Sequence, residues 1–514
     1  MKVIAMYLPQ FHKVKENDEW WGEGFTDWVA SKQAQPLYEG HYQPHVPLGN
    51  NYYNLLDKRA MERQAELMHQ YGVDGMCIYH YWFKDGRQIL EKPAENLLGW
   101  KDIDMPYCFC WANETWARSW SNVGEKNVWA DFFERERNGT GTLLEQQYGG
   151  EEEWRSHFAY LLPFFCDERY IKFEGKPVFV FYKADQIECL ADMAEVWNRL
   201  AQENGLPGIY MIGSKTDKST RDVVEAELHI EPSKTLKYVP VRLCSGIPVL
   251  DYDEVWRSIL TELPMKSKTY FGGFVGFDDT PRRGKNGTVV MNAAPEKFGG
   301  YLAELMAKNA AYGMDAVFIN AWNEWGEGMY LEPDEKDGYR YLEQIETAKK
   351  QYRKYVSYYK AQRDETLSKH VQIPLQERDK FALYLNLYDR WMSLHERNIT
   401  LSQCLQKKGY RNIAVYGYGN LGKHFVAEAA QAGLTVSYVI DRQKARTDEG
   451  VCVYAPEDDL PRVDAVIISA EYYINEVRKT LRKKVSVPLI SIGMLIKEAE
   501  EIMEAYTGSG KCDG

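Results

Sequence analysis

The chain has 514 residues, of which 63 are Lys or Arg and 75 are Asp or Glu, giving a formal net charge of −12. Apolar residues make up 45% and charged residues 27% of the sequence, which is typical of a folded globular protein. The acidic balance disfavours a nucleic-acid-binding protein, which needs a basic surface. No apolar run approaches the roughly 18 residues of a membrane-spanning helix. The length predicts two or three domains.

The N-terminus and the cysteines indicate the compartment. The first residues, MKVIAMYLPQFH, contain one Lys and only a short apolar run before Pro9, so we expect no signal peptide. The nine cysteines form no CxxC pair, which favours reduced thiols over a disulfide framework or a zinc site. We therefore expect a cytoplasmic protein without a metal.

Strand-like and helix-like segments alternate over the first two thirds of the chain. Glycines at 72, 205 and 313 follow three helical stretches, where a left-handed cap residue is expected. Eight strand–helix repeats predict a (β/α)8 barrel, a TIM barrel of the α/β class, over residues 1–360. An open doubly wound sheet, which has the same periodicity, is the alternative. The strand-like runs are residues 3–8, 75–81, 107–112, 177–182, 209–213, 227–230, 269–277 and 316–321.

The remaining chain predicts two further parts. Residues 361–409 are expected to be a helical linker, with one helix from about 379 to 408 that contains no glycine or proline. Residues 410–505 predict a small Rossmann-like α/β domain, because the turn GYGNLG lies between a strand and a helix and an acid ends the next strand. A nucleotide would contact Gly417, Gly419, Gly422 and Asp441. The alternative is that the turn serves packing alone.

Polar and aromatic residues gather where the predicted barrel strands end, which is where (β/α)8 enzymes hold their sites. Of the 15 Trp, fourteen precede residue 330. Aromatic faces stack on sugar rings while amides and carboxylates bind hydroxyls, so we predict a site for an oligo- or polysaccharide. The predicted substrate-binding residues are Tyr7, Gln10, His12, His80, Tyr81, Trp82, Trp111, Asn113, Glu114, Glu231, Asp278, Asp279, Arg282, Trp322, Asn323 and Trp325.

A pair of acids follows the last predicted strand. In the segment NAWNEWGEG, residues 320–328, Glu324 and Glu327 are three positions apart, and glycines at 326 and 328 permit a tight turn. Glycosidic bond cleavage needs two carboxyl groups in different protonation states. Neighbouring indoles would exclude water and raise the pKa of one carboxyl group, as a general acid requires. We predict that both glutamates are catalytic; the alternative is that they are solvated loop residues.

Seven motifs, in this order, resemble the WbsX-type proteins of bacterial surface-polysaccharide loci: YLPQFH, WWGEGFTDW, GHYQPH, YHYWF, CWANE, GFDDTPRR and NAWNEWGEG. The resemblance covers about residues 1–360. Through the NEWxEG core, that group is similar to glycoside hydrolase family 99, the endo-α-mannosidases and endo-mannanases. This resemblance implies that Glu324 deprotonates the sugar's own 2-hydroxyl, that Glu327 is the general acid, and that configuration is retained through a 1,2-anhydro sugar. It implies no metal or other cofactor for the barrel.

Three functions remain open from the sequence. The first is a retaining glycoside hydrolase acting on an internal α-glycosidic linkage. The second is a WbsX-type glycosyltransferase that builds O-antigen or capsular polysaccharide. Metal-dependent transferases often use an Asp-x-Asp motif, which Asp102–Asp104 and Asp251–Asp253 match by letter alone. The second of these lies at a predicted helix start, where Asp is favoured as a cap. The third function is a catalytically inactive glycan-binding barrel.

Overall fold

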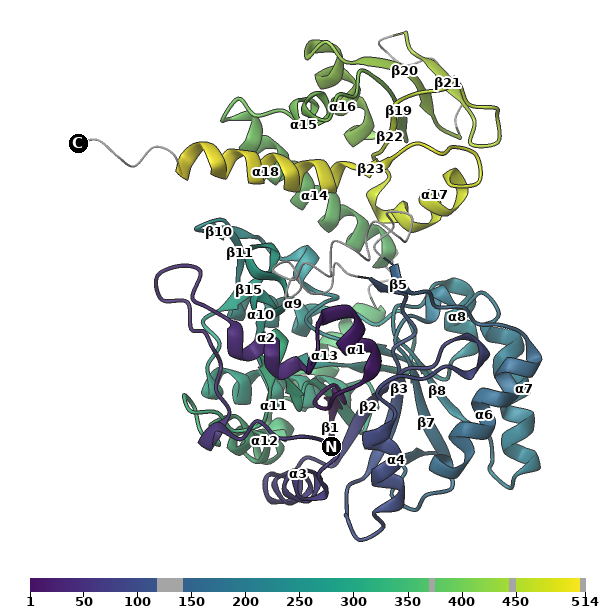
Figure 1. Ribbon diagram of the computed structural model, residues 1–514, viewed down its shortest axis with the longest axis vertical. Helices are drawn as coiled ribbons and strands as arrows, with labels where there is room; N and C mark the ends of the chain where they lie inside the picture. Colours follow the sequence, from purple (N-terminus) through teal and green to yellow (C-terminus); the bar gives the residue numbers. More distant parts are fainter. Residues whose placement is uncertain (118–141, 369–374, 443–449, 509–514) are drawn as a thin grey trace. The chain divides into compact units, whose positions relative to one another are not determined.

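The computed structural model of the chain (Figure 1) describes residues 1–117, 142–368, 375–442 and 450–508. The chain divides into two compact units, Met1–Val371 and Gln372–Gly514. Eight cysteines lie among the described residues and are free thiols, whereas Cys512 lies outside them. In the described part of the chain, no helix combines the length and apolar character needed to cross a membrane.

A closed parallel barrel forms the first unit, as predicted. Adjacent strands pair in the order β12-β9-β8-β7-β3-β2-β1-β16-β13. β12 and β13 are two parts of the seventh strand, and they close the barrel because β12 pairs with β9 while β13 pairs with β16. The strands are β1 (Lys2–Tyr7), β2 (Gly75–His80), β3 (Tyr107–Trp111), β7 (Lys176–Phe181), β8 (Tyr210–Gly213), β9 (Ala226–His229), β12 (Thr269–Phe271), β13 (Gly273–Phe274) and β16 (Ala316–Asn320).

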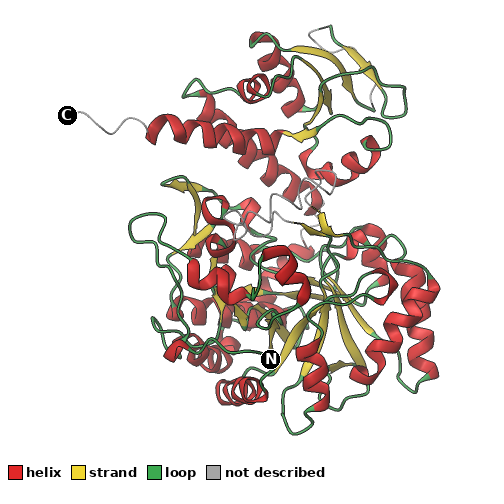
Figure 2. Ribbon diagram, viewed as in Figure 1, coloured by secondary structure: helices red, strands yellow, loops and turns green. Residues whose placement is uncertain are grey.

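Helices surround the barrel strands (Figure 2). The glycines expected to cap helices are left-handed, with φ of 76° at Gly72, 78° at Gly205 and 81° at Gly313. Inward helix faces and the strands share one hydrophobic core. The helices are α3 (Lys58–Tyr71), α4 (Lys92–Gly99), α6 (Glu151–Phe165), α7 (Leu190–Glu203), α8 (Lys218–Val223), α9 (Tyr252–Thr261), α11 (Pro295–Ala311), α12 (Arg340–Gln351) and α13 (Val356–Ser368).

Short elements follow the C-terminal ends of the strands and shape that end of the barrel. Two helices follow β1, namely α1 (Lys15–Trp21) and α2 (Asp27–Gln33). A small sheet in the order β10-β11-β15-β14 carries α10 (Thr280–Arg283) after the seventh strand. Its strands are β10 (Arg242–Cys244), β11 (Ile247–Asp251), β14 (Phe277–Asp278) and β15 (Val289–Met291). After β16, the hairpin of β17 (Asn323–Glu324) and β18 (Met329–Tyr330) encloses the 3-10 turn η8 (Trp325–Glu327).

The second unit contains a five-stranded parallel sheet in the order β21-β20-β19-β22-β23. β19, the first strand in sequence, is central; β20 and β21 lie on one side of it and β22 and β23 on the other, as in the first five strands of a doubly wound sheet. The strands are β19 (Asn412–Tyr416), β20 (Thr435–Ile440), β21 (Cys452–Tyr454), β22 (Ala465–Ile468) and β23 (Leu489–Ser491), and the helices between and after them are α16 (Asn420–Gln431), α17 (Ile474–Leu481) and α18 (Ile492–Gly508).

The single helix expected at about 379–408 is two helices, α14 (Leu375–His395) and α15 (Leu401–Lys407). The helix breaks because Asn398 is left-handed, with φ of 58°, and Thr400 starts a new helix with a capping box. Leu387 and Trp391 of α14 pack in the hydrophobic core of the second unit. Much of the segment expected to be a linker therefore belongs to this core.

The turn GYGNLG is tightly packed at one glycine and open at another. A Cβ on Gly422 would lie 2.1 Å from the Gly417 carbonyl oxygen, whereas a Cβ on Gly419 would have nothing within 4 Å. We expect Gly422→Ala to lower the free energy of unfolding of the second unit by about 1–3 kcal/mol, because backbone must move. Gly419→Ala is the control, with an expected change within about 0.5 kcal/mol. Urea unfolding checks both, and equal losses would contradict the expectation.

Candidate active site

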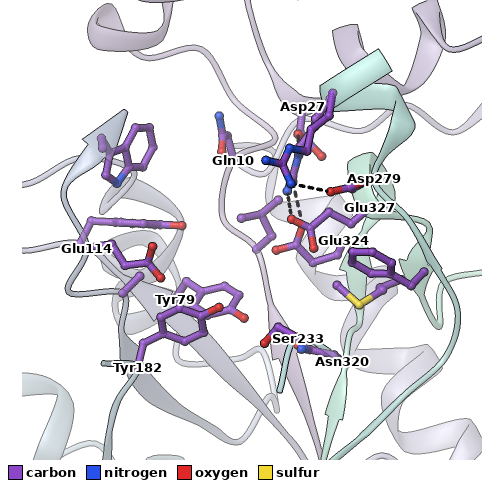
Figure 3. A pocket seen from close by; sticks show the side chains of 18 of the residues that line it. Gln10, Asp27, Tyr79, Glu114, Tyr182, Ser233, Asp279, Asn320, Glu324 and Glu327 are labelled. Carbon is purple, nitrogen blue, oxygen red and sulfur yellow. Dashed lines mark hydrogen bonds and ion pairs between the residues drawn. The ribbon is translucent and has the colours of Figure 1, made fainter. Parts of the chain in front are cut away.

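A cavity of about 390 Å³ opens at the C-terminal ends of the barrel strands (Figure 3). This volume falls within the range of about 300–1,000 Å³ that is usual for small-molecule sites. Glu114, Tyr79 and Tyr182 lie across the cavity from Glu324 and Glu327 (Figure 3). The structure brings these predicted residues into its wall: Gln10, Tyr81, Glu114, Asp279, Arg282, Glu324 and Glu327.

One guanidinium group joins three carboxylates at this wall. Arg282 Nη1 donates to Glu327 Oε1 at 2.6 Å, and Nη2 donates to Glu324 Oε2 at 2.7 Å. The third bond runs from Arg282 Nε to Asp27 Oδ1 at 2.9 Å. The N–H donors of a guanidinium form a rigid planar fork, so Arg282 fixes the carboxylates relative to one another. The Arg282 side chain is only 17% exposed, and these contacts are therefore poorly screened by water.

Asp27, the first residue of α2, was not predicted from the sequence. Besides Arg282, its carboxylate accepts a hydrogen bond from the Gly326 backbone N–H at 3.1 Å. Gly326 lies between the two glutamates, so Asp27 holds both the turn that carries them and the arginine that joins them. An acid in the first turn of a helix is ordinarily explained by the helix dipole. The position of Asp27 within the motif WWGEGFTDW is the signal that could have identified it.

The remaining wall is largely aromatic and was mostly missed from the sequence. Tyr79 and Tyr81 enter it from the end of β2, two positions apart. Because successive side chains on a strand point to opposite faces, residues two apart share a face. The wall also contains Trp21, Phe25, Trp116, Tyr182, Ser233, Phe277, Arg283, Asn320 and Met329.

The two glutamates differ in their proton affinity. Burial raises the pKa of Glu327 to about 8, the Glu324 charge adds to this, and Arg282 opposes it. Burial also raises the pKa of Glu324 from its ordinary value, with Arg282 acting against the rise. Burial and the Glu324 charge therefore favour the protonated form of Glu327 near neutral pH.

Several predicted aromatic residues face the surrounding helices instead of the cavity. His80 Nε2 lies 2.8 Å from His157 Nε2 of α6, and the Trp82 ring stacks on His157 at 4.4 Å. Trp111 is buried and packs edge-on against the same histidine. Strand alternation explains the difference, since His80 and Trp82 alternate with the cavity-lining tyrosines.

The predicted indoles beside the glutamates also point away from the cavity. Trp322 Nε1 and Trp325 Nε1 donate to the two oxygens of Glu332, at 3.0 and 2.8 Å. Burial raises the pKa of Glu332 to about 7. Asn323 bonds both backbone polar groups of Leu8, which ties the end of β1 to the turn that carries the two glutamates. Trp322, Asn323 and Trp325 therefore stabilise the turn on the side that faces away from the cavity.

The other predicted residues lie outside the cavity wall and are bonded within the protein. The Tyr7 hydroxyl donates to Gln64, and His12 Nδ1 contacts the Pro9 carbonyl oxygen. These two residues, and the three described in the next sentence, do not line this cavity. Asn113 bonds the backbone of Lys183, Glu231 accepts the Thr235 N–H, and Asp278 accepts bonds from His41 and Gln43.

We expect Asp27→Asn to lower the pKa of Glu327, because the Asp27 charge raises the pKa of both glutamates and the amide removes it. The sequence resemblance implies that Glu327 is the general acid, which must hold a proton to act. The alkaline limb of the pH–rate profile for glycan cleavage should therefore move to lower pH. The activity itself should fall by up to about 100-fold, since the turn loses a charge-assisted anchor. A steady-state profile measures both effects. An alkaline limb unchanged from the wild type would contradict this expectation.

The GYGNLG turn of the second unit has a left-handed first glycine, with φ of 90° at Gly417. Asp441, the acid predicted to bind a ribose, accepts a hydrogen bond at Oδ2 from the Tyr418 N–H at 2.7 Å. One of its carboxylate oxygens therefore stabilises the turn. Nucleotide binding by Gly417, Gly419, Gly422 and Asp441 stays a prediction. Across the described residues, no group of three or more His, Cys, Asp or Glu side chains has a metal-binding arrangement.

Comparison with known proteins adds the following findings. The uncharacterized protein WxcX of Xanthomonas campestris pv. campestris is 31% identical over 354 residues, which are 66% of this chain and 48% of the relative. The chain thus spans about half the length of this curated relative. Among solved structures, the GH99 endo-alpha-mannosidase of Bacteroides thetaiotaomicron is similar, with 15% identity and a TM-score of 0.42, covering 69% of this chain and 98% of that one.

A further solved structure, described as a glycoside hydrolase-like protein, has 12% identity and a TM-score of 0.40, and the match covers 68% of this chain and 93% of that one. The family described as Glycosyltransferase WbsX matches residues 3–345, which include nearly the whole barrel and both glutamates. The chain therefore belongs to the WbsX family.

Proposed function

We propose that the barrel is a carbohydrate-active enzyme that cleaves or transfers an internal α-glycosidic linkage with retention of configuration. The observation that carries the proposal is the arrangement of Glu324 and Glu327 on one guanidinium in a cavity with aromatic walls. Glycosidic cleavage needs two carboxyl groups in different protonation states, and here a buried Glu324 lies beside a partly exposed Glu327 whose pKa is raised to about 8. The resemblance of the sequence motifs to family 99 makes an α-mannosidic linkage the first to test.

In the proposed reaction, Glu327 donates its proton to the departing glycosidic oxygen. Glu324 accepts the proton of the sugar's 2-hydroxyl, and that oxygen attacks the anomeric carbon as the glycosidic bond breaks. This first step forms a 1,2-anhydro sugar as the intermediate. Glu327, now ionised, deprotonates an incoming water or acceptor hydroxyl, which opens the three-membered ring while Glu324 returns its proton to O2. This division of roles is supported by burial and by the Glu324 charge, which together raise the pKa of Glu327 although Arg282 opposes the rise.

A transferase that uses a nucleotide-activated sugar is the second candidate, favoured by the family description. The cavity wall holds more acids than bases: Asp27, Glu114, Asp279, Glu324 and Glu327 against Arg282 and Arg283. This excess of negative charge repels a diphosphate and suits an uncharged glycan. Transfer to an acceptor hydroxyl in place of water would give a transferase activity with the same two glutamates.

The Asp-x-Asp sequences do not favour a nucleotide-sugar donor. Asp251 caps α9 by accepting bonds from the backbone N–H groups of Asp253 and Glu254. Asp102 forms an ion pair with Lys58. Neither pair lies in the wall of the cavity. Asp251 and Asp102 therefore each have a local structural role.

The test is incubation of the full chain with α-mannan and other α-linked polysaccharides, with chromatography of the released oligosaccharides. We expect release by the wild type and by Glu346→Gln, a control in which the changed side chain is 58% exposed on α12. Glu324→Gln and Glu327→Gln should each lower release by about 100-fold or more. Turnover that requires a nucleotide sugar would support the transferase instead, and binding without turnover of either kind would support the inactive barrel.

A further inference from the structure

A second cavity, of about 220 Å³, lies next to the first and shares the Phe277 side chain with it. Its wall is built by the loop at 38–45, by β15 and β18, and by the turn at 334–337, and neither catalytic glutamate contributes to it. The aromatic and polar side chains in its wall include Tyr38, Tyr42, His45, Tyr330, Asp334 and Lys336.

The motif GHYQPH, which the first cavity leaves without a role, belongs to this wall. His41 Nε2 and Gln43 Nε2 both contact Asp278 Oδ2, at 2.7 and 2.6 Å. Asp278, predicted to bind substrate, therefore lines the second cavity and not the first. Two residues of the motif hold the acid in place, while Tyr42 and His45 face the cavity as part of its lining.

A hydrogen-bonded chain crosses the same wall. The Tyr330 hydroxyl donates to Asp334 Oδ2 at 2.8 Å, so His45 Nδ1, 2.5 Å from that hydroxyl oxygen, must donate to it. Burial lowers the pKa of His45 to about 4, so the ring is neutral at pH 7 and one of its two nitrogens carries no proton. The Lys336 ammonium lies over the Tyr42 ring at 4.5 Å and supplies donors.

We propose that the second cavity binds one uncharged sugar ring of a glycan. Tyrosine faces suit the C–H faces of such a ring, and acceptors and donors placed side by side suit its hydroxyls. Asp278, Asp334 and Asp337 in the wall disfavour an anionic ligand. The volume is below the usual range for larger ligands, which limits the occupant to about one ring. The ligand class follows from the proposed function, but binding here requires no catalysis in the first cavity.

The test is calorimetric titration of the full chain carrying both Glu324→Gln and Glu327→Gln with D-mannose, D-glucose, D-galactose and N-acetyl-D-glucosamine. We expect saturable binding of at least one of them. Tyr42→Ala, at a side chain 37% exposed, should raise the dissociation constant at that site about tenfold or more. Tyr42→Phe should retain binding. The matched control is Tyr358→Ala on α13, where the side chain is 57% exposed and binding should not change.

Lys336→Ala is a second variant of an exposed wall residue. Circular dichroism spectra that match the wild type are required of each variant. Absence of saturable binding, or binding that ignores both Tyr42→Ala and Lys336→Ala, would overturn the proposal. Inorganic phosphate that competes with the sugar would also overturn it, by showing an anion site. Failure of glycan cleavage by the wild type is a separate result, because these titrations use a chain without its two glutamates.

Discussion

Wild-type kcat/KM should decrease as the pH rises through about 8, because Glu327 must hold a proton to act as the general acid and burial raises its pKa to about 8. The activity is present below this pKa and is lost above it. On the acid side, activity should decline as Glu324 becomes protonated, at a pH above the ordinary glutamate value because burial also raises its pKa. Initial rates between pH 4 and 10 measure both limbs.

Glu327→Gln should lower kcat by about 10²- to 10⁴-fold and remove the alkaline limb. An aryl glycoside with an acidic phenol leaving group needs little protonation, so the variant should lose much less activity on such a substrate. Glu324→Gln should lose activity equally on both substrates, because proton removal from the 2-hydroxyl is still needed. If Glu327→Gln were equally inactive on both substrates, its assignment as the acid would be wrong.

Replacing Arg282 with Met should lower the free energy of unfolding by about 3–5 kcal/mol at pH 7, because two buried carboxyl groups and the partly exposed Glu327 lose their shared cation. Activity should be lost as well, since the fork no longer orients Glu324 and Glu327. Urea unfolding followed by tryptophan fluorescence measures the stability.

The pH dependence of this loss has a definite sign. Without the guanidinium, the pKa values of both glutamates rise further, so the native state holds protons that the unfolded chain releases. Stability of Arg282→Met should therefore fall as the pH rises above about 4.5 and the deficit should shrink toward acid pH. Arg283→Met is the control: this side chain is 44% exposed and pairs with Asp279, so we expect a loss below about 1 kcal/mol. A deficit independent of pH would contradict the electrostatic explanation.

The barrel could be predicted because its signals are local. Each strand is a short apolar run ended by polar residues, and each connecting helix has a regular apolar face, so the alternation is visible without knowledge of contacts. The two glutamates were identifiable for the same reason, since they follow the end of the last strand by four and seven positions. The break between α14 and α15 was not, because Asn398 adopts a left-handed conformation that no glycine or proline marks.

The composition of the cavity wall depends on contacts between distant segments. His80 and Trp82 are chemically suited to a sugar site, yet the direction in which β2 faces places them against His157. Trp325 is adjacent to Glu324 in sequence but its indole bonds Glu332. In the sequence Asp27 looks like an ordinary first residue of a helix. Its role depends on its contacts with Arg282 of α10 and with Gly326 of the turn after β16.

The arginine fork also bears on how the protein is made. Asp27 and the Arg282 side chain that it binds are 255 positions apart, and the glutamates come later still. A chain emerging from the ribosome therefore exposes the first acid long before its partners exist. Incomplete translation products that end before residue 324 lack both glutamates, so only chains that extend past the last barrel strand and its turn can carry the proposed activity.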